Sequence, residues 1–271
     1  MKKSLQIGSL IFLFVFSFFL TNKIRSIVKN MDTIMIKIKE NYKTYEILGM
    51  DAKCYNDRIT PGISTKLVDI SSSYNKMRKN GDYNPKYYVY NTIKPDVSID
   101  NNKDKYIFKG NSIKKMISIN FIINDTKSIK DIIWILNKNK VKATFFVNDE
   151  WILNNLEFAN SMKKSNFIIG LNKVNNYKNI KTIIKKILKE KNIYCTYYNK
   201  KSIKNCSKIN GYTIKGKIVN NNFFYETKDN LHSGLIITFT DKSVINELDN
   251  IIFYVKKKGF KIENLDNHLI E

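Results

Sequence analysis

The stretch KVKATFFVNDEW, Lys140–Trp151, decides the fold of this chain. Its first half alternates polar and apolar residues, which predicts a β-strand with one apolar face formed by Val141, Ala143, Phe145 and Val147. Its second half is a polar turn, followed by an aromatic residue that opens a helix. A strand that runs directly into a helix is typical of α/β proteins.

The segment before this stretch repeats the pattern. KKMISINFIINDTKSIKDIIWILNK, residues 114–138, predicts a strand, a loop and an amphipathic helix. A chain of 271 residues with 43% apolar content can bury one substantial core and a smaller appendage. These observations favour an α/β fold.

The string NKNKVKATFFVNDEW, residues 137–151, resembles the second strand of the NodB-homology domain of polysaccharide deacetylases. Residues 234–269 resemble the last strand, last helix and closing strand of that family. The resemblance covers residues 111–271 and implies a distorted, incomplete (β/α) barrel. Its strands are expected near residues 116–123, 142–147, 166–169, 193–198, 212–219, 234–239 and 260–263.

Residues 5–21, LQIGSLIFLFVFSFFLT, form an uncharged run behind two lysines. A helix of this length spans about 25 Å, enough for a bilayer core. Since no pair of small residues marks a cleavage site, we expect an uncleaved transmembrane signal anchor, with a cleaved signal as the alternative. The flanking charges leave the orientation open. Because relatives act on cell-wall glycans, the resemblance implies that the bulk of the chain is extracytoplasmic.

The remaining N-terminal half is expected to contain a juxtamembrane segment, residues 22–56, and an irregular extracytoplasmic region, residues 57–110. That region holds all three prolines and several turn residues. Residues 61–100 resemble the segment that precedes the deacetylase domain, residues 111–271 here, in membrane-anchored, sporulation-associated deacetylase-like proteins of spore-forming Gram-positive bacteria.

The net charge of +23 raises the possibility of an anionic partner such as nucleic acid, lipid or wall polymer. Nearly all the basic residues are lysines, spread evenly and accompanied by many Asn and Ile residues, which indicates a bias in composition. No zinc-finger, helix-turn-helix or RNP motif is present, so we expect no nucleic-acid partner.

The three cysteines form no CxxC pair, so a structural zinc site is not expected. Cys195 and Cys206 can pair across a loop if the domain lies outside the cytoplasm. The odd count without a spacing signature favours free thiols, and this is our prediction.

Active members of the family hold a divalent metal with one Asp and two His residues, and a second Asp activates the bound water. The resemblance places the two acid positions at Ile122 and Ile123, the latter being the metal-ligand position. It places the histidine positions at Asn172 and Asn176. Isoleucine offers no ligand atom, and an Asn oxygen is a poor ligand for Zn²⁺. The resemblance therefore implies no metal and no cofactor.

Two further positions depart from the family. Its arginine position holds Cys195, and the histidine near the end of its last long strand corresponds to Thr240. Asp125 is a possible substitute for a lost carboxylate, although it also reads as the N-cap of the next helix, as does Asp149.

The chain has two histidines, each without a second His or a Cys nearby. His232 resembles a structural turn before a strand in relatives, and His268 is expected to be exposed near the C-terminus. Three aromatic residues, Trp151, Tyr197 and Tyr198, are expected at the rim of the former active site, where their rings can stack on sugars or simply pack.

The sequence leaves three hypotheses. The first is a membrane-anchored, catalytically inactive polysaccharide deacetylase homologue that binds cell-wall glycan or an envelope protein in wall or spore-envelope assembly. The second is a residual peptidoglycan N-deacetylase, a hydrolase of C–N amide bonds with a relocated site. The third is a basic surface protein held to anionic lipid or wall polymer by charge alone.

Overall fold

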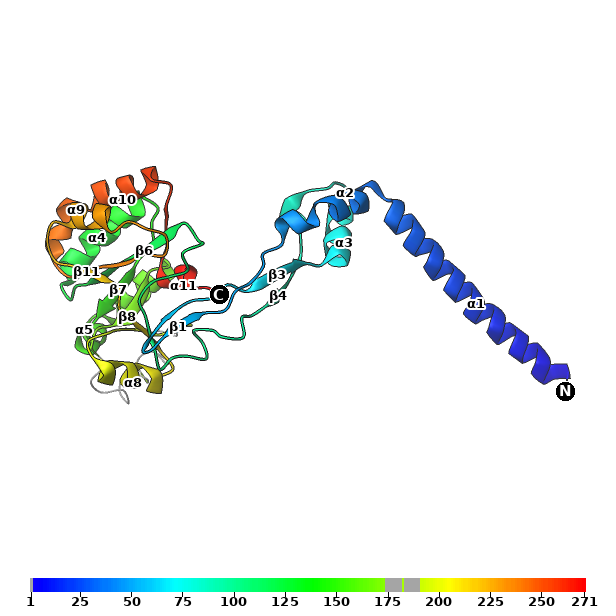
Figure 1. Cartoon of the computed structure of the whole chain (residues 1–271), viewed down its shortest axis with the longest axis horizontal. Coiled ribbons are helices and arrows are strands. Elements are labelled where there is room, and N and C mark those ends of the chain that lie inside the picture. The colour runs from blue at the N-terminus through cyan, green and yellow to red at the C-terminus, as the bar shows by residue number, and fades with distance from the viewer. Residues whose placement is uncertain (1, 174–181, 183–190) are drawn as a thin grey trace. The chain divides into compact units, whose positions relative to one another are not determined.

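The structure is a computed structural model that describes residues 2–173, 182 and 191–271. They separate into two compact units (Figure 1). The smaller unit contains Met1–Leu48 and Ser64–Ile93, and the larger one contains Gly49–Ile63 and Lys94–Glu271. The two units are therefore interleaved along the chain.

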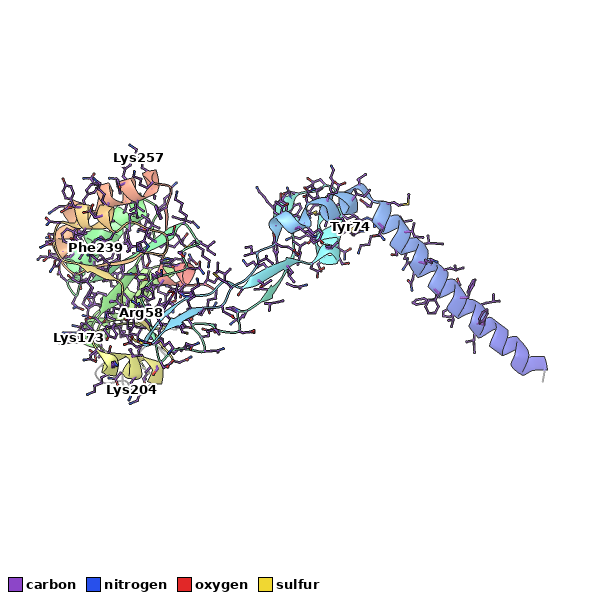
Figure 2. All side chains as sticks on the ribbon, viewed as in Figure 1. Arg58, Tyr74, Lys173, Lys204, Phe239 and Lys257 are labelled. Carbon is purple, nitrogen blue, oxygen red and sulfur yellow. A yellow bond between two sulfur atoms is a disulfide. The ribbon has the colours of Figure 1, made fainter. Side chains whose placement is uncertain are left out.

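The apolar N-terminal run lies in a single helix, α1 (Lys2–Met31), which includes the predicted segment 5–21. Its stretch Ile11–Met31 is long and apolar enough to cross a membrane. The apolar side chains of this stretch are exposed and project around the helix (Figure 2). A retained anchor and a cleaved signal both predict such a helix.

The rest of the smaller unit packs two short helices against a two-stranded antiparallel sheet. The carboxylates of Asp32 and Asp69 cap the two helices by accepting backbone hydrogen bonds from their first turns. Its elements are α2 (Thr33–Asn41), η1 (Tyr42–Tyr45), β3 (Thr65–Val68), α3 (Ile70–Asn80), η2 (Pro85–Tyr87) and β4 (Tyr90–Ile93). Its core consists of Met35, Ile38, Val68, Tyr74, Met77 and Tyr88.

The larger unit is built on a curled sheet with the spatial order β1-β2-β5-β10-β9-β8-β7-β6-β12-β11, in which β13 also pairs with β6. Its strands are β1 (Lys53–Tyr55), β2 (Arg58–Thr60), β5 (Tyr106–Ile107), β6 (Met116–Ile122), β7 (Thr144–Val147), β8 (Ile168–Leu171), β9 (Tyr194–Thr196), β10 (Tyr212–Ile214), β11 (Lys217–Val219), β12 (Ile236–Phe239) and β13 (Lys261–Ile262). All of their pairings are parallel except β1 with β2. The predicted incomplete barrel is confirmed.

Helices cover the outer face of this sheet, and α4, α9 and α10 lie together on one side of it (Figure 1). The described helices of the unit are α4 (Thr126–Lys138), α5 (Asp149–Asn154), α6 (Leu156–Lys164), α8 (Lys200–Lys208), α9 (Phe223–Asp229), η4 (Lys242–Asn246), α10 (Leu248–Lys257) and α11 (Leu265–His268).

Successive residues of the central strands face two different cores. Phe145 packs in the outer core, between the sheet and the helices, whereas the next residue, Phe146, packs in the inner core inside the curl. All four residues of β7 are buried. Burial on both faces explains why three consecutive residues of this strand, Phe145–Val147, are apolar.

The prediction of one strand over residues 212–219 is wrong. The chain forms β10, which pairs with β9 and β5, and then β11, which pairs with β12 near the other end of the sheet. Gly216 lies between them, and a Cβ atom there would collide with the carbonyl oxygen of Ile236. Glycine thus permits the close approach that carries the chain across the open side of the barrel. The other six expected strands each overlap an observed one.

The C-terminal segment packs into the larger unit and forms hydrogen bonds with it. Leu265 and Leu269 lie in the inner core. The carboxylate of Asp266 accepts hydrogen bonds from the Tyr194 hydroxyl (2.8 Å) and from the side-chain amide of Asn192 (2.9 Å). The carboxylate of Glu271 accepts hydrogen bonds from the backbone N–H groups of Gly62 (2.8 Å) and Ile99 (3.0 Å), which lie in two segments distant in sequence.

The prediction that His268 is exposed is wrong, because its side chain is fully buried. Residues Leu265 and His268 are three positions apart in α11, so both turn inward. Gly110 leaves the space that the imidazole ring occupies. Burial lowers the pKa of His268 to about 4, and the charge of Lys114 acts in the same direction against that of Glu263.

We predict that the fold loses stability as the pH falls from about 6.5 to about 4, because the unfolded chain binds a proton at His268 before the folded chain does. The loss due to this group should reach about 3 kcal/mol at most. Thermal unfolding of the full chain in neutral detergent measures it, and His268→Leu should flatten the pH profile. His232→Leu, at an exposed position, is the control and should keep the wild-type profile. Identical profiles for wild type and His268→Leu would contradict the prediction.

Candidate functional site

The carboxyl ends of β6, β7, β8 and β9 meet at one rim of the sheet, because these strands are parallel neighbours. Polar side chains recur there at intervals of 24 residues and are linked by hydrogen bonds. The Asn148 backbone N–H donates to Asn124 Oδ1 (2.9 Å), Asn172 Nδ2 donates to Asn148 Oδ1 (3.2 Å), and Thr196 Oγ1 donates to Asn172 Oδ1 (3.2 Å). We call these four residues the rim chain.

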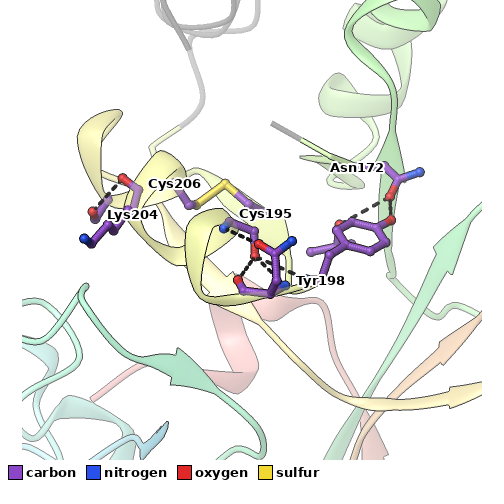
Figure 3. The surroundings of a disulfide bond; sticks show 9 residues. Asn172, Cys195, Tyr198, Lys204 and Cys206 are labelled. Atoms are coloured by element: carbon purple, nitrogen blue, oxygen red, sulfur yellow. Dashed lines mark hydrogen bonds between the residues drawn. A yellow bond between two sulfur atoms is a disulfide. The ribbon is translucent and has the colours of Figure 1, made fainter. Parts of the chain in front are cut away.

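Asn172, at the expected first histidine position, is the centre of the rim chain. Its side-chain oxygen accepts hydrogen bonds from the hydroxyls of Thr196 and Tyr198, and its side chain is buried (Figure 3). The oxygen therefore already has two donors. The second expected histidine position, Asn176, lies outside the described residues.

The two expected acid positions face different environments. Ile122, the last residue of β6, is half-buried, packs against the inner core and lines a cavity at the rim. Ile123 is buried in the outer core, on the opposite face. The structure therefore does not bring these two side chains together.

The cavity at the rim has a volume of about 30 Å³, which is room for about one water molecule. Its described lining combines apolar side chains, hydroxyl groups and one ammonium group, that of Lys215. Its lining consists of Ile122, Phe146, Thr196, Tyr197, Tyr198, Ile214, Lys215, Gly216, Ile218 and Thr238.

The residues present do not fit a divalent metal. Ile122 and Ile123 carry no ligand atom, and the Asn172 oxygen is occupied by two hydroxyl donors. Within residues 2–173, 182 and 191–271, no three His, Cys, Asp or Glu side chains lie close enough together to hold a metal ion. His232 is exposed, and its Nδ1 contacts the carbonyl oxygen of Ser233 at 2.9 Å in the turn before β12.

The prediction of free thiols is wrong for two of the three cysteines. Cys195 of β9 faces the outer core and forms a disulfide with Cys206 of α8 (Figure 3). The turn between strand and helix is short, and α8 presents Cys206 to the sheet, so the two Cα atoms lie 6.1 Å apart. Cys54 is free and exposed. The disulfide brackets the turn that carries Tyr197 and Tyr198.

Thr240, the expected late histidine position, lies just beyond β12, and its backbone N–H donates to the carbonyl oxygen of Val219 (3.1 Å). Thr238, two residues earlier, is the residue of this strand that lines the cavity. Thr238, Asn124 and Asn148 were not expected at the site from the sequence. The 24-residue interval of the strand ends was an available signal for Asn124 and Asn148, but not for Thr238.

Asp125 caps α4, because its carboxylate accepts hydrogen bonds from the backbone and hydroxyl of Ser128. These bonds lower the pKa of Asp125, so its carboxyl is ionised at neutral pH. The expectation that Asp149 is a cap is wrong. Asn148 occupies the cap position of α5, and Asp149 is the first residue of that helix.

The three aromatic candidates separate into two groups. Trp151 is buried in the outer core, donates from Nε1 to Thr126 Oγ1 (3.0 Å) and is therefore a packing residue. Tyr198 is 43% exposed and lies under Lys173, whose Nζ is 5.4 Å from the ring centre. Tyr197 is half-buried and lies under Lys215 at 4.4 Å. Of these three candidates, the two tyrosines can offer a ring face at the rim.

Comparison with known proteins finds matches to parts of this chain. Residues 109–197 match the polysaccharide deacetylase family model. An uncharacterised protein of Bacillus subtilis, YlxY, is 30% identical over 151 residues, which are 54% of this chain and 46% of that protein. The match therefore spans about half the length of this relative.

Solved structures give the same fold. A CE4 family pseudoenzyme from Bacillus anthracis aligns with a TM-score of 0.65 and 23% identity, over 88% of this chain and 95% of that one. A mutant of that pseudoenzyme with restored enzymatic activity aligns with a TM-score of 0.64 and 23% identity, over 88% and 98% of the two chains. A family 4 carbohydrate esterase from Bacillus anthracis aligns over 60% of this chain and 86% of its own, with 22% identity and a TM-score of 0.50.

The opposite environments of the two isoleucines predict unequal effects of restored acids. Ile123→Asp should destabilise the fold by roughly 3–5 kcal/mol, because it buries a carboxylate without a partner. Ile122→Asp faces the cavity and the rim hydroxyls, so its cost should be about 1–2 kcal/mol. Denaturant unfolding of the two variants at neutral pH measures the difference. Equal losses would show that the two side chains share one environment.

Proposed function

Because residues 109–197 are a polysaccharide deacetylase domain, we propose that this chain binds cell-wall or spore-envelope glycan without hydrolysing it. The observation that carries this proposal is the lining of the rim cavity. Ile122 lines this cavity, and the side-chain oxygen of Asn172 is bonded to two hydroxyl groups. Among the described lining residues, none carries a carboxylate or an imidazole that could hold a metal or activate water.

The glycan would lie across the rim, since the cavity of about 30 Å³ cannot admit a sugar ring. Tyr198 offers an exposed ring face, and sugars present apolar C–H faces that pack on such rings. Lys173 and Lys215 lie over the two tyrosine rings and would favour an acidic glycan. An envelope protein is the second partner consistent with this surface.

We further propose that α1 anchors the chain as a single span with the larger unit outside the cytoplasm. The exposed apolar stretch Ile11–Met31 supports an anchor. The Cys195–Cys206 disulfide supports an oxidising compartment, in which such bonds persist.

A residual peptidoglycan N-deacetylase is the competing proposal, and it would rely on Asp125 as the base. This carboxylate is exposed and ionised, which a general base requires. The same carboxylate accepts a hydrogen bond from Ser128 as the cap of α4. The nearby Trp151 is a packing residue and offers no ring face to a substrate. We therefore favour binding without hydrolysis.

The full chain in neutral detergent should cosediment with purified peptidoglycan, and Tyr198→Ala should weaken the binding about fivefold, the loss expected for one ring contact of about 1 kcal/mol. Tyr225→Ala removes another exposed tyrosine, on α9, and is the matched control that should bind as wild type does. Metal analysis of the same preparation should find no stoichiometric divalent ion.

Two results would count against this proposal. If Tyr198→Ala and Tyr225→Ala bind alike, the rim is not the glycan site. If acetate is released from the peptidoglycan and Asp125→Asn abolishes the release, the residual deacetylase is correct.

For the location, we predict that the mature protein keeps residues 5–21 and stays in the membrane fraction. Thiol labelling before reduction should modify Cys54 alone, and labelling after reduction should modify all three cysteines. N-terminal sequencing and mass spectrometry of the labelled chain give both results. A mature N-terminus between about Thr21 and Asn30 would indicate a cleaved signal.

A further inference from the structure

Lysine side chains gather around a concavity at the amino ends of β7 and β13. Its volume is about 400 Å³, within the range of roughly 300–1,000 Å³ that small-ligand sites have. Because β6, β7 and β13 are parallel, this concavity lies at the edge of the sheet opposite the rim chain. Its lining includes Lys140, Lys142, Lys256, Lys261 and Phe260.

A fifth lysine belongs to the same group. Lys115, immediately before β6, holds its ammonium 5.3 Å from the centre of the Phe260 ring and lies next to Gly259. We define the lysine basin as Lys115, Lys140, Lys142, Lys256 and Lys261. The even spread of lysines in the sequence does not reveal it, because it is assembled from three separate segments.

The negative charge nearby is smaller than the positive charge of the lysine basin. One carboxylate, Glu263, lines the concavity and pairs with Lys261 at 2.5 Å. The helices α4 and α10 end here, and each C-terminus contributes about −0.5 of a charge. Lys256 stabilises the C-terminal end of α4, because its ammonium group donates to the carbonyl oxygen of Asn139 (2.5 Å). Five ammonium groups against about two negative charges leave roughly +3.

Helix-end stabilisation therefore explains Lys256, and also Lys140, which directly follows the C-cap of α4, but not the whole group. Lys142 donates to Asn137 Oδ1 (3.1 Å), a neutral partner, and lies over the Phe167 ring at 4.5 Å. Holding several ammonium groups around one concavity is repulsive unless an anion joins them.

We propose that the lysine basin binds a phosphate-bearing soluble polyanion. Ammonium groups act as compact point charges that bind phosphate oxygens in many orientations. A phosphate-bearing polyanion carries several negative charges and can neutralise a site of roughly +3. A concave site suits a chain or group that enters it, and a flat lipid surface would contact only its edges. This site is separate from the glycan rim, and its occupancy does not depend on the function proposed for that rim.

Tripolyphosphate titrated into the full chain in neutral detergent tests the proposal by calorimetry. Lys140→Gln together with Lys142→Gln should weaken binding about tenfold, since two ammonium groups leave the site. Lys200→Gln together with Lys201→Gln removes the same charge from exposed positions on α8 and should change the affinity less than about twofold. Equal losses in the two double variants would overturn the proposal, because general charge would then explain the binding.

Acylation footprinting of the wild-type chain keeps the test independent of how the variants fold. Tripolyphosphate should protect Lys140, Lys142 and Lys256 from an acylating reagent more than it protects Lys200. Absence of protection would refute the site. Equal protection by nanodiscs of phosphatidylglycerol without tripolyphosphate, but not by nanodiscs of neutral lipid, would assign the lysine basin to a membrane surface and reject the soluble polyanion.

Discussion

Burial of both faces of the central strands is the constraint on which the larger unit depends. Phe145 and Phe146 are neighbours in sequence, yet one fills the layer under the helices and the other fills the inside of the curl. A polar atom in either core is favoured only with a partner, because an unpaired polar group there costs several kcal/mol. Ser118 Oγ and Asn120 Oδ1 of β6 are exceptions, since both are buried without a partner. At the strand ends the side chains leave the two cores, so polar groups can be placed there at a lower free-energy cost.

The rim chain satisfies this requirement with neutral groups. Amides and hydroxyls at the ends of β6 to β9 satisfy one another and need no ion. A metal site at the same place would hold charged ligands whose mutual repulsion only the metal relieves. The neutral arrangement is therefore stable without an ion.

The sequence predicted the elements that a periodic pattern reveals. It did not predict which way single side chains point from short helices. Residues 140–145 alternate polar and apolar side chains and lead into a polar turn, so the strand and the helix after it were predictable. The residue spacing of Cys195 and Cys206 did not reveal that α8 turns one thiol toward the other. His268 lies in a helix of four residues, too short for a periodic pattern to reveal its buried side. Trp151 follows a strand end, as rim residues do, but the first turn of α5 points its ring inward.

The interleaving of the two units has a consequence for the family domain. The chain passes between the units three times, after Leu48, Ile63 and Ile93. The strands β2 and β5 precede the deacetylase domain expected from residue 111, yet they cover the edge of β10. A fragment that starts at residue 111 would therefore carry an open sheet edge, free to pair with another molecule. The segment ahead of the family domain therefore covers a sheet edge with residues that the family match does not contain.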